Sequence, residues 1–342
     1  MPIRARAPTR IDFAGGTTDL PSFRKREGGA VVSATIDRYA YCSLTRCDGN
    51  GFRIVSQDLE RFVEAANIRE LEYDGNLDLL KAAIRALDLP GGICVNVRCD
   101  APPGSGTGSS ASVGVALLGL LDRLKASAAD NRRQCLSRFE IAEMACNLEQ
   151  DLGIVGGKQD QYAAAVGGFN YMEFYDEHRV IVEPLELRPE VRLELHKHLL
   201  LCYSGQSRLS GDTNQRMISA YESEDPVVCG ALRTVKRVAM DVRRALIGAD
   251  IGWLGELLEE EWQARAMLAP GVVTERLQAL RDAGINAGAV AAKVCGAGGG
   301  GCLLFLCSDD SEAAVSRALE AAGGRIISFG FDFRGLEVWQ AP

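Results

Sequence analysis

Residues 102–110, PPGSGTGSS, combine glycines and serines in a spacing that suits phosphate binding. Alternating glycines let the backbone turn sharply and approach a ligand closely. An apolar segment with helical character follows from Ser109. Because the free amides and the positive dipole end of a helix start attract anions, the loop predicts a phosphate cradle. The residues predicted to contact the phosphates are Pro103, Gly104, Ser105, Gly106, Thr107, Gly108, Ser109 and Ser110.

Two widespread phosphate motifs do not describe this loop. The P-loop ends in Gly-Lys followed by Ser or Thr, and no such ending occurs here. The dinucleotide fingerprint has a different glycine spacing. The plain structural alternative is a capped helix after a flexible loop. We favour a phosphate site because three alternating glycines exceed what a helix cap needs.

A second glycine loop occupies residues 296–301, and Gly296, Gly298 and Gly301 do match G-x-G-x-x-G. The sequence CLLFLC follows, which reads as a strand, whereas the dinucleotide motif requires a helix there. A nicotinamide-dependent dehydrogenase is therefore disfavoured. We expect a strand–loop–strand turn pressed against another backbone or a ligand, with Gly298 near the substrate.

Residues 149–161, EQDLGIVGGKQDQ, form a third candidate segment. Gly156 and Gly157 precede an expected helix start, which would hold Asp160 in an exposed first turn. A carboxylate there can accept the proton of an attacking hydroxyl. Glu149, at the end of the preceding helix, can reach a metal ion. Lys158 is expected to lower the pKa of Asp160 and keep it ionised.

The N-terminal stretch APTRIDFAGGTTDL, residues 7–20, adds Arg10, a glycine pair and Asp19. Carboxylates beside glycines often bind sugar hydroxyls, because each oxygen accepts two hydrogen bonds. An ordinary loop cap is the alternative for Asp19.

The elements that must position these loops mix strands and helices in both halves, which indicates an α+β fold. Alternating apolar and β-branched residues predict strands, and helical spacing of apolar residues predicts helices. The expected strands are 30–47, 52–57, 61–66, 92–100, a hairpin within 167–184, 191–203, 288–295, 301–307 and a final pair within 325–340. The expected helices are 76–88, one from Ser109, 132–151, 212–222, 226–247, 251–268, 273–283 and 310–322.

Composition excludes several protein classes. The 342 residues carry a net charge of −8, which argues against nucleic acid as a partner. No apolar run reaches the roughly 18 residues of a membrane span, and the N-terminus lacks the apolar stretch of a secretory signal. Eleven cysteines suit reduced, buried thiols in a cytoplasm better than a disulfide framework. A metal site built from cysteines and histidines is disfavoured too, since only three histidines occur and two of them, His196 and His198, fall in an expected strand.

Four segments in this order resemble the GHMP kinases: APTRIDFAGGTTDL, PPGSGTGSSAS, EQDLGIVGGKQDQYAAAVGGFNYMEF and KVCGAGGGGCLLF. The closest resemblance is to the heptose 7-phosphate kinase branch and to the kinase part of bifunctional fucokinases. The strand GGAVVSATIDRYAYCSL also resembles that branch, so the similarity covers nearly the whole chain.

The resemblance implies two domains with ATP bound between them. Residues 1–187 would form a domain like ribosomal S5 domain 2, and residues 188–342 a ferredoxin-like domain with added helices. Asp160 matches the family's catalytic aspartate. Ser110 and Glu149 match its Mg²⁺ ligands. Arg10 falls where galactokinases carry an arginine beside that aspartate, and Asp19 where sugar hydroxyls bind.

The implied reaction is transfer of the γ-phosphoryl group of ATP to the anomeric hydroxyl of a small sugar phosphate. The leading acceptor is D-glycero-D-manno-heptose 7-phosphate, which would give the 1,7-bisphosphate. Fucose-like sugars, cyclitol phosphates and a non-catalytic sugar and ATP sensor are alternatives. Gly16 and Thr17 replace the Glu-His pair of galactokinases, which argues against galactose. The further residues expected at the substrate are Gly16, Thr17, Gly157, Lys158, Arg208 and the basic cluster 24–26. A homodimer is one assembly that the sequence allows.

Overall fold

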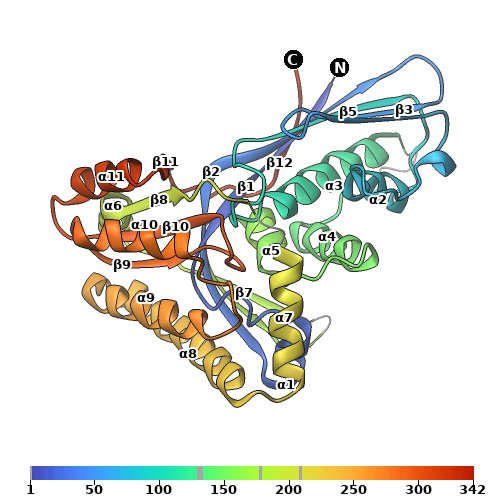
Figure 1. The fold of residues 1–342 in the computed structure, drawn as a ribbon. Coiled ribbons are helices and arrows are strands. Elements are labelled where there is room, and N and C mark those ends of the chain that lie inside the picture. Colours follow the sequence, from blue (N-terminus) through green and yellow to red (C-terminus); the bar gives the residue numbers. More distant parts are fainter. Residues whose placement is uncertain (1, 129–133, 177–178, 208–209) are drawn as a thin grey trace.

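One long strand, β2 (Gly29–Arg46), forms the centre of the first sheet. Its β-branched and aromatic residues suit a pleated, half-buried surface. β1 (Ile3–Ala14) runs antiparallel along most of its length. On the other side, the C-terminal part of β2 pairs with β5 (Ile93–Cys99) and its N-terminal part with β6 (Phe169–Phe174). The computed structural model describes residues 2–128, 134–176, 179–207 and 210–342 (Figure 1).

The first sheet has the strand order β12-β1-β2-β5-β3-β4, and β6 with β7 (Val180–Pro184) extends it beside β2. β3 (Phe52–Ser56) and β4 (Arg61–Ala65) form the predicted hairpin. β12 (Glu337–Gln340) pairs with β1, so the last strand of the chain joins the sheet that the first strand begins. The two ends of the chain consequently lie close together (Figure 1).

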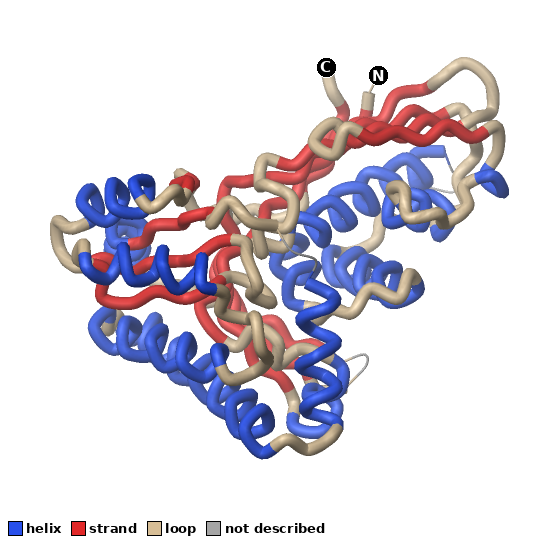
Figure 2. The backbone as a smooth tube through the Cα atoms, in the orientation of Figure 1, coloured by secondary structure: helices blue, strands red, loops and turns tan. Residues whose placement is uncertain are grey.

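Helices cover one face of this sheet (Figure 2). They are α2 (Asp78–Ala86), α3 (Ser109–Ala128), α4 (Arg138–Asp151) and α5 (Gln159–Val166). α3 is apolar on most sides because it lies between the sheet and α4, where Val115, Leu118 and Leu121 are fully buried. Two short helices complete this part, α1 (Pro21–Glu27) and the 3-10 turn Ile68–Glu70.

The second sheet is antiparallel and has the order β11-β8-β10-β9. Its strands are β8 (Leu199–Tyr203), β9 (Ala289–Val294), β10 (Cys302–Cys307) and β11 (Arg325–Ile327). Counted along this half, the order is 4-1-3-2, the ferredoxin-like arrangement, so the predicted α+β class is confirmed. Its helices are α6 (Pro189–His198), α7 (Ser210–Glu222), α8 (Pro226–Gly248), α9 (Ile251–Ala266), α10 (Glu275–Asn286) and α11 (Glu312–Ala321).

A shared apolar core joins the two sheets. Ile11 and Phe13 of β1 and Val32 of β2 belong to the same buried cluster as Leu201 of β8 and Leu304 of β10. Packing of this kind fixes the two halves against each other and so fixes any cleft between them. The division of the chain at residues 187 and 188 stays a prediction.

Two expectations about elements are wrong, and one strand was not predicted. Residues 3–14 form a strand that was not expected. Residues 189–198 form helix α6, which starts at Pro189 with Glu190 in its first turn and ends with His196 and His198, so the expected strand is confined to 199–203. Pro at the helix start and basic residues at its end favour this helix. The expected pair within 325–340 separates, because β11 joins the second sheet and β12 the first.

The cysteines also depart from expectation in one place. Cys47 and Cys94 form a disulfide with a Cα–Cα distance of 5.8 Å, because neighbouring strands β2 and β5 bring them together. The other nine cysteines are free, and Cys42 is among the buried ones. Burial raises the pKa of the Cys42 thiol, as expected for a thiol packed among apolar residues. Within the described part of the chain, no helix is both long and apolar enough to cross a membrane.

Candidate active site

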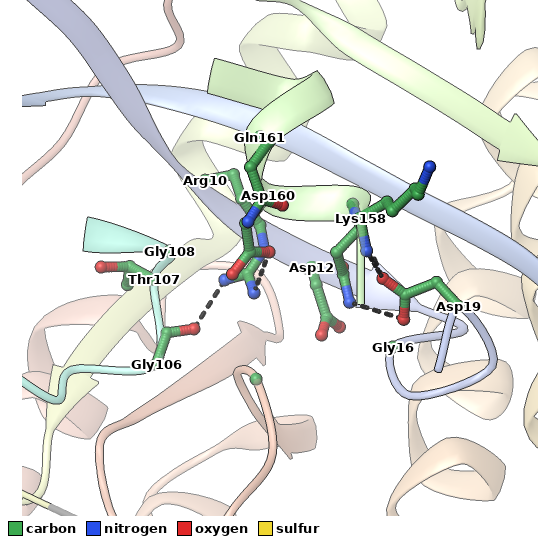
Figure 3. Close-up of polar contacts among 12 residues, drawn as sticks. Arg10, Asp12, Gly16, Asp19, Gly106, Thr107, Gly108, Lys158, Asp160 and Gln161 are labelled. Atoms are coloured by element: carbon green, nitrogen blue, oxygen red, sulfur yellow. Dashed lines mark hydrogen bonds and ion pairs between the residues drawn. The ribbon is translucent and has the colours of Figure 1, made fainter. Parts of the chain in front are cut away.

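A cleft of about 630 Å³ lies where the glycine-containing segments 104–110, 153–157 and 296–300 meet helices α3, α5 and α7. Among the predicted residues, those lining it are Arg10, Thr17, Asp19, Gly104, Gly106, Gly108, Ser109, Ser110, Glu149, Gly157, Asp160 and Gly298. Residues from positions 10 to 298 therefore meet in one place, although the sequence separates them widely (Figure 3).

The first glycine loop leads directly into the start of α3 at Ser109. Gly104, Gly106 and Gly108 all have positive φ angles, of 68°, 75° and 74°, which other residues adopt only with strain. A side chain on Gly106 would also overlap the carbonyl oxygen of Cys295. Ser105 and Thr107 are buried and share a hydrogen bond of 2.7 Å between their hydroxyls, so they stiffen the loop from behind and do not line the cleft. Pro103 is exposed beside it and also does not line the cleft.

The second glycine loop packs backbone to backbone against the first. The amide of Cys302 donates to the Ser105 carbonyl at 2.8 Å. A Cβ on Gly296 would lie 2.9 Å from the Gly106 carbonyl oxygen. β9 precedes the loop and β10 follows it, so the predicted strand–loop–strand turn is confirmed and the helix of a dinucleotide site is absent from residues 302–307. The second glycine loop therefore supports the first glycine loop from behind.

Asp160 lies in the first turn of α5, as its glycine-rich approach predicts. It faces the first loop: a Cβ on Gly108 would lie 3.0 Å from the Asp160 carboxyl carbon. Arg10 of β1 is 2% exposed and joins the two, with Nη2 at 2.6 Å from Asp160 Oδ1 and Nη1 donating to the Gly106 carbonyl at 2.6 Å. One guanidinium thus fixes the carboxylate relative to the loop (Figure 3).

Charge around Asp160 is set by Arg10 and Asp19. Burial raises the pKa of Asp160, Arg10 opposes this rise, and the negative charge of Asp19 adds to it. Lys158 does not have the role that we expected from its sequence position. Its Nζ forms an ion pair with Glu143 at 2.6 Å, and its side chain does not line the cleft. The partly buried carboxylate of Glu143 therefore holds the ammonium of Lys158 away from Asp160.

Glu149 and Ser110 stand beside Asp160 at the ends of two other helices. Burial, followed by the charge of Asp160, raises the pKa of Glu149 to about 7, while hydrogen bonds from Gln161 and Ser110 oppose the rise. The Gln161 amide donates to Glu149 Oε2 at 2.7 Å. The described residues contain no cluster of three or more His, Cys, Asp or Glu side chains that could hold a metal alone. The donors fit Mg²⁺, which commonly takes one or two protein oxygens and completes its shell with water and phosphate.

Asp19 caps helix α5. Its Oδ2 accepts from the backbone amides of Lys158 at 2.8 Å and Gln159 at 2.9 Å, and the side chain is 1% exposed. The loop-cap alternative therefore describes its contacts, although Asp19 also lines the cleft. Gly157 is required here, because a side chain on it would overlap the Asp19 carboxylate. Gly16 lies behind the cleft lining, against Asp12.

Helix α7 supplies cleft residues that sequence reasoning missed. Asp212, Asn214 and Gln215 line the cleft, and the Asn214 amide donates to the Val155 carbonyl at 2.9 Å. Thr17 Oγ1, Gln159 Oε1 and Asn214 Oδ1 are buried without a hydrogen-bond partner among the described residues. Such orphaned acceptors at a cleft wall suit a ligand with many hydroxyls. The polar run GDTNQ was the available signal.

The basic residues expected to bind a substrate phosphate are not gathered in the cleft. Arg24 is buried in α1 and donates to the Asp19 carbonyl at 2.9 Å, and neither it nor its neighbours Lys25 and Arg26 line the cleft. All three basic residues belong to helix α1. Arg208 lies outside the described residues.

A helix-start phosphate cradle facing an arginine–aspartate pair is the arrangement of a phosphotransferase site. The family descriptions "GHMP kinases N terminal domain" and "GHMP kinases C terminal" match residues 77–168 and 242–325. The chain belongs to the GHMP kinase family, whose members transfer phosphate to an alcohol group.

Individual relatives are similar over the full chain. A D-glycero-alpha-D-manno-heptose 7-phosphate kinase of Campylobacter jejuni is 30% identical over 99% of both chains. The crystal structure of a D-glycero-D-manno-heptose 1-phosphate kinase from Bacteroides thetaiotaomicron superposes with a TM-score of 0.80, at 30% identity and 99% coverage of both chains. A bifunctional fucokinase/GDP-fucose pyrophosphorylase of Arabidopsis thaliana is 26% identical over 91% of this chain and 30% of its own length.

Proposed function

We propose that this protein transfers the γ-phosphoryl group of ATP to the anomeric hydroxyl of D-glycero-D-manno-heptose 7-phosphate, giving the 1,7-bisphosphate and ADP. The observation that carries the proposal is the position of the Asp160 carboxylate, which lies against Gly108 and is clamped by Arg10. Support for the acceptor comes from the Campylobacter relative, which carries that activity in its name and matches 99% of this chain.

The nucleotide phosphates would lie over residues 104–110. There the loop amides and the N-terminal end of α3 face the cleft and provide the positive field that a triphosphate needs. Ser110 and Glu149 are the proposed protein ligands of Mg²⁺, with phosphate oxygens completing the shell. When bound, this ion would neutralise charge on the transferring phosphate.

Asp160 would orient the attacking hydroxyl and take up its proton. The acceptor oxygen forms a bond to the γ-phosphorus, the bond to the bridging oxygen of ATP breaks, and ADP leaves. Arg10 favours the ionised form of the carboxylate, because it opposes the rise that burial causes in the pKa of Asp160. Phosphoryl transfer depends mainly on positioning and charge stabilisation, so the Arg10 clamp matters as much as proton uptake.

The sugar would occupy the side of the cleft between α5, α7 and the loop at residues 15–20. Asp19, Thr17, Gln159 and Asn214 line the cleft, and the last two each carry a buried side-chain oxygen without a hydrogen-bond partner among the described residues. Gly157 and Gly298 also line the cleft, and a Cβ would overlap the Asp19 carboxylate at Gly157 and Val272 at Gly298. Arg208 stays the predicted contact for the acceptor's own phosphate, while Lys158 is engaged by Glu143.

A panel of acceptors with coupled ADP detection tests the proposal. We expect turnover with the heptose 7-phosphate, and ³¹P spectra of the product should show a new anomeric phosphate. The similarity to a fucokinase makes fucose the main competitor, and a cyclitol phosphate belongs on the panel as well. Turnover of unphosphorylated sugars alone would refute the proposed acceptor. ATP binding without turnover of any acceptor would favour a sensor.

A further inference from the structure

Four charged side chains lie fully buried beneath the cleft loops. They are Asp12 of β1, Glu261 and Arg265 of α9, and Lys293 of β9, and each is 0% exposed at its side chain. Two acids face two bases, so the group is balanced in charge. None of the four lines the cleft, and the reaction described above does not use them.

The four side chains form one chain of contacts. Lys293 Nζ contacts Asp12 Oδ1 and donates to the Asp12 carbonyl at 2.9 Å. It also lies 3.7 Å from Glu261 Oε1. The same Glu261 oxygen accepts from Arg265 Nη2 at 2.9 Å. Buried ion pairs seldom stabilise more than well-packed apolar side chains would, so stability alone does not explain this group.

The contacts of Arg265 suggest a role for the buried group, because its guanidinium bridges two functional loops. Nη2 donates to the Gly16 carbonyl at 2.8 Å, on the sugar side of the cleft. Nη1 donates to the Gly296 carbonyl at 2.9 Å, in the second glycine loop. The fit is tight, since a Cβ on Gly16 would lie 2.5 Å from Asp12 Oδ2 and 3.0 Å from Arg265 Nη2. Figure 3 draws Asp12 below the Arg10–Asp160 pair and near the Gly16 loop.

The second glycine loop in turn supports the phosphate cradle. Gly296 packs against Gly106, whose carbonyl accepts from Arg10. A continuous path therefore runs from the Gly16 loop through Arg265 and Gly296 to Gly106, and on through Arg10 to Asp160. Arg10 connects the phosphate cradle to the Asp160 carboxylate. Arg265 connects the loop at residues 15–20 to the second glycine loop, which supports the cradle.

We propose that Arg265 is a positioning residue that fixes the acceptor-binding loop at residues 15–20 relative to the phosphate cradle. Glu261 contacts its guanidinium directly, and Lys293, which is paired with Asp12, lies beside Glu261. This inference rests on the proposed function, because the loop matters only if an acceptor binds beside it. A planar fork with two donors is needed, and a lysine ammonium in its place reaches one carbonyl but not both.

Arg265→Lys is the direct test, with Arg281→Lys as its matched control. Arg281 of α10 forms an ion pair with Glu259 of α9 and touches neither loop. We expect Arg265→Lys to lower kcat/KM for heptose 7-phosphate about ten- to a hundredfold, the scale of a misplacement near 1 Å. Affinity for a non-hydrolysable ATP analogue should stay within about threefold, and Arg281→Lys should resemble the wild type.

Amide hydrogen exchange supplies a readout that does not depend on turnover. The loop amides of Thr18 and Leu20 bond to the carbonyls of Gly15 and Thr17. Arg265→Lys should speed exchange across residues 15–20 and 296–301, while the strands β8 and β10 keep their protection. If the wild type does not phosphorylate the heptose phosphate, the proposed function fails, and exchange with ATP-analogue binding still tests Arg265.

A second variant tests the proposal in case Arg265→Lys does not fold. Glu261→Met with Arg265→Met removes one acid and one base together, replaces them with apolar side chains, and leaves Lys293 paired with Asp12. We expect a folded protein with the same loosened loops and the same loss with acceptor. Wild-type kcat/KM and unchanged loop exchange in either variant would overturn the proposal. A uniform gain in exchange over the whole chain would overturn it too, since the role would then be general stability.

Discussion

Arg10 Nη2 lies 2.6 Å from Asp160 Oδ1, and the same guanidinium donates through Nη1 to the Gly106 carbonyl at 2.6 Å. A buried arginine of the first strand therefore fixes the distance between the glycine loop and the carboxylate that faces it. The geometry of the site depends on this one arginine.

Replacing Arg10 by Met should slow turnover and change its pH dependence. We expect kcat to fall about 10²- to 10³-fold, the loss typical of removing one preorganised donor. Arg10 lowers the pKa of Asp160, so its loss raises that pKa, and the acid limb of the rate profile should move to higher pH. The measurement is kcat/KM between pH 5 and 9. An unmoved acid limb would disprove the electrostatic part of this role.

Replacing Asp19 by Asn should move the acid limb of the rate profile to lower pH. The charge of Asp19 raises the pKa of Asp160, so its removal lowers that pKa and extends activity to lower pH. Asn keeps an oxygen that can accept from the amides of Lys158 and Gln159, whereas Ala does not. Thermal unfolding should therefore show Asp19→Ala to be less stable than Asp19→Asn, by about 1 kcal/mol. Equal stability of the two variants would argue against the cap.

Replacing Gly106 by Ala should weaken nucleotide binding. Its φ of 75° disfavours a side chain, and the added methyl would overlap the Cys295 carbonyl. We expect a destabilisation of about 1–3 kcal/mol and loss of ATP-analogue affinity in calorimetry. Gly230→Ala is the control, because that glycine lies inside α8 with open space around it, and alanine favours the helix there by about 0.5–1 kcal/mol. Normal ATP affinity in Gly106→Ala would contradict the role of the loop.

Replacing Glu27 by Gln should make stability less dependent on pH. Hydrogen bonds from Arg233 and Tyr221 hold the pKa of Glu27 below its ordinary 4.5. A carboxyl with a lowered folded pKa stabilises the fold above the unfolded pKa and loses this contribution as pH falls through the folded pKa. We expect Glu27→Gln to lose at most about 1 kcal/mol at pH 7, because its arginine partner is exposed, and to approach the wild type as pH falls below the folded pKa.

Denaturant unfolding at several pH values measures this difference. Glu224→Gln is the control, since Glu224 is exposed and lies 3.9 Å from Arg26. A gap between Glu27→Gln and wild type that is constant from pH 3 to 7 would contradict the prediction.

The loops could be predicted from the sequence because their signals are local. The spacing of Gly104, Gly106 and Gly108 and the run before Asp160 specify turns at helix starts without reference to distant residues. The partner of Lys158 could not be predicted, since Glu143 is reached only once α4 packs against α5.

Most features that the sequence did not predict depend on contacts between residues far apart in the chain. Arg265 and Gly16 lie 249 positions apart and meet only in the folded chain. β12 joins β1 across nearly the whole sequence, and Cys47 meets Cys94 only because β2 and β5 pair. Helix α6 was different, because Pro189 at its start and the basic residues at its end were visible signals that the apolar alternation obscured.

We propose that the carboxylate of Asp160 acts on the acceptor while the glycine loop binds the nucleotide. Asp160→Asn keeps the side-chain shape, so it separates these two roles. We predict that phosphoryl transfer to heptose 7-phosphate falls at least about 10²-fold, while affinity for a non-hydrolysable ATP analogue stays within about threefold. Turnover equal to that of the wild type in Asp160→Asn would contradict the account.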